Sequence, residues 1–160
     1  MATAPTVPTR EVITNGDSRI SIIRPAAPIA GAEADRMLTV FDINHPSISP
    51  DNYNKADGAP LRVLYSSAAK LDISKRSHED MGFWHRSVDH SEIIICIQGA
   101  LRWETELGTH VLRSGQALVI PRGVAHRSAL APESAEENIL LEIKVAADLD
   151  YVGPDGALIP

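Results

Sequence analysis

The chain alternates short runs of apolar and polar residues, and turn-forming residues separate these runs at short intervals. The clearest runs cover 91–99, 100–106, 109–115, 116–123, 124–130 and 138–146. Alternation with a period of two, bounded by Gly, Pro, Asn or Asp, is typical of β-strands. No segment keeps a helical period, so the pattern predicts an all-β sandwich or barrel.

The first half of the chain is less regular. Strands are expected over 18–25, 37–43 and 61–68, the segment 70–82 is ambiguous between strand and loop, and 45–60 has the composition of a long loop. Residues 1–17 are rich in Thr, Pro and Ala and end in Asn-Gly-Asp, which indicates an extended arm closed by a turn. The expected parts are this arm, a single barrel domain over 18–146 and a C-terminal tail over 147–160.

The composition narrows the class of protein. A length of 160 residues fits one domain, and 44% hydrophobic with 22% charged residues is an ordinary globular balance. The net charge is −6 and the basic residues are scattered, which argues against nucleic acid or an anionic membrane as partner. The single cysteine, Cys96, lies in an apolar run, where a buried thiol in a reducing compartment is expected. With no secretory signal and no apolar run of membrane-spanning length, a cytoplasmic protein is expected.

The strand over 91–98 is apolar on both of its faces. Glu92, Ile94, Cys96 and Gln98 share one face, and Ile93, Ile95 and Ile97 share the other. Such a strand is expected to be covered on both sides. Either the N-terminal strands or a second copy of the chain would cover the isoleucine face, and we expect a homodimer.

Four of the six histidines fall between residues 83 and 130. His85 and His90 lie just before Glu92, and His126 follows a Pro-Arg-Gly turn. Imidazole and carboxylate groups suit a divalent first-row metal, and two His with one carboxylate is the set of non-haem Fe(II) oxygenases. His85, Glu92 and His126 could supply that set.

The spacing of these residues resembles the two motifs of the cupin superfamily. The first motif, His-x-His-(x)3–4-Glu-(x)6-Gly, is matched by His85, Glu92 and Gly99, with Ser87 in place of the second His. The second motif is Gly-(x)5-Pro-x-Gly-(x)2-His-(x)3-Asn. It is matched by Gly115, Pro121, Gly123 and His126, with Leu130 in place of Asn. The resemblance implies a double-stranded β-helix, or jelly roll, here with additional N-terminal strands.

The resemblance also sets expectations for the site. His90 would either replace the metal ligand missing at Ser87 or act as an acid or base. Ser87, Gln98 and Trp103 are expected to line the substrate pocket, Gln98 because it faces inward in a regular strand. His110, on a short strand of its own, is expected to lie on the surface or in packing.

A narrower resemblance concerns function. The runs HRSVDHSE and ETELGTHVLRSGQALVIPRGVAHR resemble the corresponding region of homogentisate 1,2-dioxygenases, which are iron-dependent and cleave aromatic rings. This implies a mononuclear Fe(II) dioxygenase acting on a small aromatic or phenolic acid. Two alternatives stay open: a cupin lyase, isomerase, dehydratase or cyclase that uses Mn, Ni or Zn as a Lewis acid, and a cupin that binds a small molecule without turnover.

Overall fold

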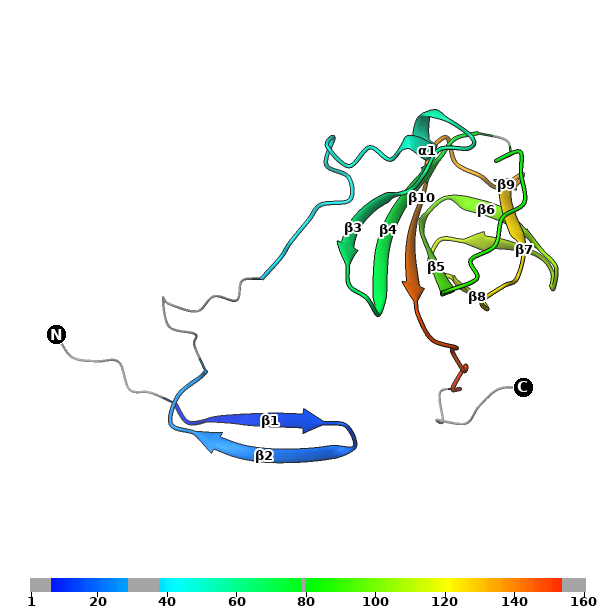
Figure 1. The fold of residues 1–160 in the computed structure, drawn as a ribbon. Coiled ribbons are helices and arrows are strands. Elements are labelled where there is room, and N and C mark those ends of the chain that lie inside the picture. Colours follow the sequence, from blue (N-terminus) through cyan, green and yellow to red (C-terminus); the bar gives the residue numbers. More distant parts are fainter. Residues whose placement is uncertain (1–6, 29–37, 79, 154–160) are drawn as a thin grey trace. The chain divides into compact units, whose positions relative to one another are not determined.

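Two separate units make up the computed structural model, Met1–Phe41 and Asp42–Pro160, and within them it describes residues 7–28, 38–78 and 80–153. The first unit holds a hairpin of β1 (Thr9–Asn15) and β2 (Ser18–Arg24), joined at Gly16 with φ 55° (Figure 1). Part of the expected arm is therefore a strand. Its partner β2 belongs to this hairpin, so the division falls after Phe41 and not after residue 17.

The second unit is a two-sheet β-structure (Figure 1). Its elements are α1 (Asp51–Asn54), β3 (Leu61–Tyr65), β4 (Ala69–Arg76), β5 (Ser91–Gln98), β6 (Ala100–Thr105), β7 (Gly108–Arg113), β8 (Ala117–Ile120), β9 (His126–Leu130) and β10 (Asn138–Val145). One antiparallel sheet has the order β3-β4-β10-β5-β8 and the other the order β7-β6-β9. This arrangement confirms the predicted all-β jelly roll.

The six strands predicted between residues 91 and 146 are all present within a few residues of their expected bounds. The strand expected over 37–43 is wrong for residues 38–43, which are mostly exposed and form no strand, while residue 37 lies outside the described part. The ambiguous segment 70–82 begins as β4. The ends of the expected arm and tail, residues 1–6 and 154–160, also lie outside the described residues.

Glycine is required where the chain reverses between β5 and β6. Gly99 has φ 78°, a conformation that L-residues with side chains rarely adopt. A Cβ at this position would also overlap the side chain of Asn138. Gly115 and Gly123, at the two marked glycine positions of the second motif, have φ 81° and 80°. The motif glycines therefore mark turns, as the spacing predicted.

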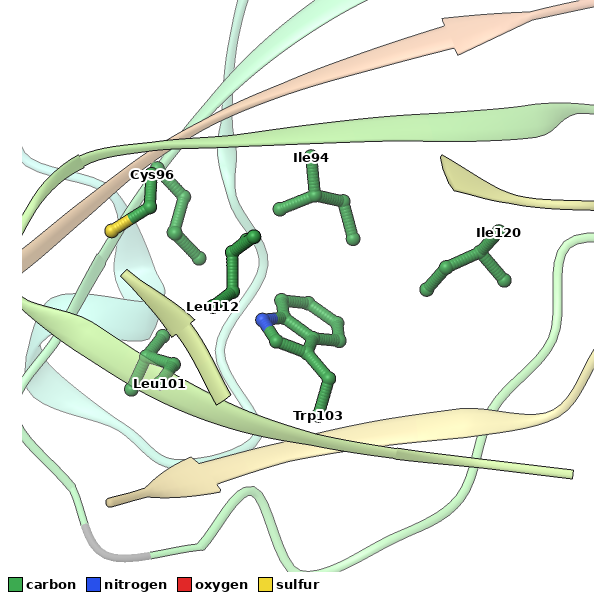
Figure 2. Close-up of a cluster of buried hydrophobic side chains, with 7 residues drawn as sticks. Ile94, Cys96, Leu101, Trp103, Leu112 and Ile120 are labelled. Carbon is green, nitrogen blue, oxygen red and sulfur yellow. The ribbon is translucent and has the colours of Figure 1, made fainter. Parts of the chain in front are cut away.

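The hydrophobic core lies between the two sheets (Figure 2). Ile94, Cys96, Ile120 and Leu140 come from the five-stranded sheet, and Leu101, Trp103 and Leu112 come from the three-stranded sheet. The thiol of Cys96 is fully buried, as expected, and burial raises its pKa. Leu130, which stands where the cupin motif has Asn, packs against this cluster.

Two strands of the larger sheet turn charged residues inward. In β10, Leu140 faces the core, so Glu142 and Lys144 share its inward face by alternation. The register pairs Glu142 with Asp72 of β4, and Lys144 with Glu92 of β5. The opposite, outer face carries five half-buried apolar side chains, Leu71, Ile93, Ile95, Leu141 and Ile143. The sheet thus has a partly charged inner face and an apolar outer face.

Candidate functional site

A cavity of about 210 Å³ is lined by side chains of both sheets and by the segments 57–60 and 81–85. Three of the four predicted metal ligands, His85, Glu92 and His126, line it. They come from three separate places: the segment before β5, the start of β5 and the start of β9. The fold therefore brings to one cavity residues that the two motifs separate in sequence.

His126 is oriented by its own backbone neighbourhood. Its ring is 1% exposed, and Nδ1 lies 3.0 Å from the carbonyl oxygen of Val124. A carbonyl oxygen can only accept, so Nδ1 carries the proton and Nε2 keeps its lone pair. Nε2 lies 3.8 Å from Oε2 of Glu92 and is buried without a hydrogen-bond partner among the described residues. This is the tautomer that a metal-binding imidazole requires.

His85 lies directly beside His126. The two residues form an isolated β-bridge, in which the His85 N–H donates to the His126 carbonyl at 3.0 Å and the reverse bond measures 2.8 Å. The ring centroids are 4.2 Å apart. Burial, with the positive charges of His126, Lys144 and Arg76, lowers the pKa of His85 to about 4. The imidazole is thus neutral near pH 7, as a metal ligand must be.

Glu92 supplies the carboxylate. It is 3% exposed, and burial raises its pKa while the charges of Lys144 and His126 oppose that shift. The side chain faces the cavity from the first turn of alternation in β5. A carboxylate held beside two neutral imidazoles forms the donor set expected for iron, manganese, nickel or zinc.

The donors fit a metal ion in chemistry. Nδ1 of His85 and Nε2 of His126 are buried without partners within residues 7–28, 38–78 and 80–153, and such orphaned nitrogens suit a ligand role. In distance the set is open: across those same ranges, no three His, Cys, Asp or Glu side chains are arranged to hold a metal. The structure places the candidate ligands on one cavity without closing them around a common point.

His90 and Ser87 do not join this group. His90 is 6% exposed, yet it does not line the cavity, and its Nδ1 contacts Oδ1 of Asp89 at 2.8 Å. The hydroxyl of Ser87 donates to the same carboxylate oxygen at 3.2 Å. The structure therefore gives His90 no position from which to replace the ligand missing at Ser87.

The two expected pocket residues on β5 and β6 have different outcomes. Gln98 is exposed, and its amide donates to the carbonyl of Glu137 at 3.2 Å. The pairing of β5 with β10 shifts between Cys96 and Gln98, so strict alternation stops before Gln98 and its inward direction is lost. Trp103 is 4% exposed and lines the cavity, as predicted.

Trp103 separates two cavities. A second one, of about 220 Å³, is lined by Trp103 and by residues of β6, β7, β8 and the turn 121–124, including the exposed His110. In the core view, the indole lies between Leu112 and Ile120 and beneath Ile94 (Figure 2). Trp103 is therefore a core residue and a cavity wall at once.

Sequence reasoning missed the charged lining of the cavity. Arg62 binds Asp72 through two hydrogen bonds of 2.8 and 3.0 Å, and Lys144 lies 3.6 Å from Asp72 and 3.7 Å from Glu142. The hydroxyl of Ser74 donates to Glu142. The alternation of charges in AKLDISKR and NILLEIKV was a usable signal. It reads as a solvent-facing pattern until the pairing with β5 shows which face is inside.

Comparison with known proteins adds a family and a fold. A family model described as an AraC-like ligand binding domain matches residues 69–147, which hold β4 to β10. Comparison with curated proteins found no match. Within the described residues, no helix is long and apolar enough to cross a membrane.

Solved structures support the same barrel. The cupin domain of Schizosaccharomyces pombe Cnp3 has a TM-score of 0.56 at 8% identity, and the similarity covers 88% of each chain. A cupin-2 domain protein from Shewanella frigidimarina has a TM-score of 0.44 at 24% identity, over 54% of this chain and 79% of that one. KdgF from Halomonas sp. has a TM-score of 0.46 at 20% identity, over 54% and 77%. Given the motif spacings, the two-sheet barrel and the family match, the chain belongs to the cupin superfamily.

Proposed function

We propose that this chain is a metal-dependent cupin enzyme in which His85, Glu92 and His126 hold one divalent ion beside a small-molecule cavity. The observation that carries the proposal is the hydrogen bond from His126 Nδ1 to the Val124 carbonyl. It fixes the tautomer and directs the free Nε2 toward Glu92. Neutral His85, in the same cavity, adds the second nitrogen.

Iron(II) is the metal we favour, and a dioxygenase reaction on a small aromatic or phenolic acid is the chemistry. Two His and one carboxylate leave positions open for substrate and dioxygen, and iron supplies the redox chemistry. The chain's own part is to hold and orient the substrate. Phe83 and Trp103 line the cavity and offer aromatic surfaces to a ring. Manganese, nickel or zinc would favour the Lewis-acid alternative, but His90 does not line the cavity from which it would act as acid or base.

Metal reconstitution tests the proposal with a matched pair of histidine variants. Purified protein is stripped with a chelator, loaded without oxygen with Fe(II), Mn, Ni or Zn, and its metal content is measured. Wild type and His110→Ala, which changes an exposed histidine of the second cavity, should bind one ion per chain. His126→Ala should bind none.

Catalysis is tested on the loaded protein. Oxygen uptake with catechol or hydroquinone acids, present with iron and absent with zinc, would support the dioxygenase. Wild-type protein that takes up no stoichiometric metal, or His126→Ala that binds it as well as wild type, would contradict the metal site. Turnover without oxygen would contradict the dioxygenase alone.

A second candidate is a cupin that binds its small molecule without turnover. Two observations favour it: the matching family model describes a ligand-binding domain, and no three candidate ligands among the described residues close around a common point. Tight retention of an unchanged small molecule by protein that binds no metal would select this function.

We also propose that two copies of the chain assemble through the outer face of the larger sheet. This face carries Ile93, Ile95, Leu141 and Ile143, all half-buried in the single chain. Apolar side chains gathered on one exposed sheet face gain free energy when covered. A cytoplasmic location and the absence of a nucleic-acid partner stay predictions from composition.

A further inference from the structure

Arg76, the last residue of β4, lies in the same cavity as the candidate metal ligands. It is 8% exposed. Its Nη1 donates to the carbonyl of Ala56 at 2.8 Å, which is the one hydrogen bond its guanidinium makes within the described ranges. A guanidinium has several further N–H donors in a rigid fork. Most of the hydrogen-bonding capacity of this buried cation is therefore free on the cavity side.

Arg76 also has no ion-pair partner within 4.0 Å among residues 7–28, 38–78 and 80–153, although a buried charge ordinarily needs one. The other charges of this face satisfy each other. Arg62 and Lys144 are paired with Asp72 and Glu142, two cations with two anions. Glu142 acts on Arg76 only as a more distant charge, and burial lowers the pKa of Arg76.

The remaining anion of the cavity interior, Glu92, is the proposed metal ligand. A divalent ion held by Glu92 and two neutral imidazoles carries a net positive charge. With the four paired residues neutral as a group, Arg76 and the metal site then leave the cavity positive. Electrostatic complementarity favours an anionic occupant.

We propose that Arg76 binds the oxyanion group, a carboxylate or a phosphate, of the small molecule that this cavity takes. The guanidinium fork matches both groups in geometry and binds them through charge-assisted hydrogen bonds. The apolar part of the molecule contacts Phe83 and Trp103 on the opposite wall. This inference deepens the proposed function and shares its cavity, but Arg76 binds an anion whether or not a metal is present.

Trp103 provides a direct readout of binding. The chain has two tryptophans, and Trp84 is 49% exposed and does not line the cavity. In a Trp84→Phe background, fluorescence therefore reports on Trp103 alone. Metal-free protein is titrated with benzoate, phenyl phosphate and the neutral isostere benzamide. Comparison of benzoate with phenyl phosphate identifies the preferred oxyanion, and benzamide isolates the contribution of charge.

The variants are Arg76→Gln, Arg76→Lys and a control, Arg102→Gln. Arg102 lies on β6, is paired with Glu104 and has a 41% exposed side chain. Wild type and the control should bind benzoate or phenyl phosphate about tenfold or more tightly than benzamide. Arg76→Gln should lose this preference, and Arg76→Lys, which keeps the charge without the fork, should retain part of it.

The inference is overturned if Arg76→Gln keeps the anion preference, or if wild type binds benzamide as tightly as both anions. Melting curves accompany each titration. If Arg76→Gln does not fold, Arg76→Lys decides, because binding equal to wild type would exclude a role for the fork. Anion preference in a protein that never takes up metal would support Arg76 while the metal proposal fails. Stoichiometric metal without anion preference would give the reverse result.

Discussion

Asn138 is expected to be the residue whose loss destabilises the barrel most without changing any cavity wall. It starts β10 and is 0% exposed. Its Oδ1 accepts hydrogen bonds of 3.0 Å from the N–H groups of Ala100 and Ala135. Its Nδ2 donates to the carbonyls of Arg76 at 2.9 Å and Ala135 at 3.0 Å. One side chain thus joins the ends of both sheets to the loop before β10.

The Asn138→Ala variant removes all four hydrogen bonds and leaves backbone groups buried without partners. Each net hydrogen bond contributes about 0.5–1.5 kcal/mol, so the expected loss is about 4 kcal/mol. At about 2–4 °C per kcal/mol for a chain of this size, the melting temperature should fall by about 10 °C.

Thermal melting followed by circular dichroism measures this effect, with urea unfolding as a second estimate of the free energy. Gln98→Ala is the matched control, because its amide is exposed and makes one hydrogen bond, to Glu137. The control should melt within about 2 °C of wild type. If Asn138→Ala also melts within that range, the argument that its four bonds join the sheets is refuted.

Two further outcomes follow from the same contacts. Glu106 accepts hydrogen bonds from the Ala125 N–H and from Arg86, which lower its pKa from the ordinary value of 4.5. Its stabilisation is present above that value and is lost as the pH falls below it, so the melting temperatures of wild type and Glu106→Gln should converge between pH 6 and about 3; a constant difference would contradict this. Ile95→Glu on the outer face should halve the mass measured by light scattering, whereas Val88→Glu at a 76% exposed loop position should not; an unchanged mass for Ile95→Glu would refute the proposed interface.

Turn chemistry explains why the second half of the fold could be predicted. Between β5 and β9, each strand stops at a residue that forces or permits a reversal, such as Gly99, Gly115 or Pro121. Alternation fixes the strands and the glycines fix their ends, so local sequence is sufficient. The spacing of His85, Glu92 and His126 then brings three residues to one cavity, which the structure bears out.

Local patterns fail where tertiary contacts decide. β1 lies in a Thr- and Pro-rich stretch that predicts an arm, and it is a strand because β2 pairs with it along its full length. Residues 38–43 have a strand-like composition but have no pairing partner and form no strand. Gln98 turns outward through a shift in pairing that no alternation rule contains. In each case the missing information is the position of a neighbouring strand.

The charged face of β4 and β10 shows the same limit with a functional consequence. Both sequences alternate charged and apolar residues, which predicts strands but leaves open which set is inside. The pairing of Lys144 with Glu92 settles it, because Glu92 shares its face with the buried Ile94. The charges therefore face the cavity, and Leu141 and Ile143 face outward. A register slip of one residue would exchange both faces at once, so the alternation that gives the cavity its charged wall also gives the sheet its apolar surface.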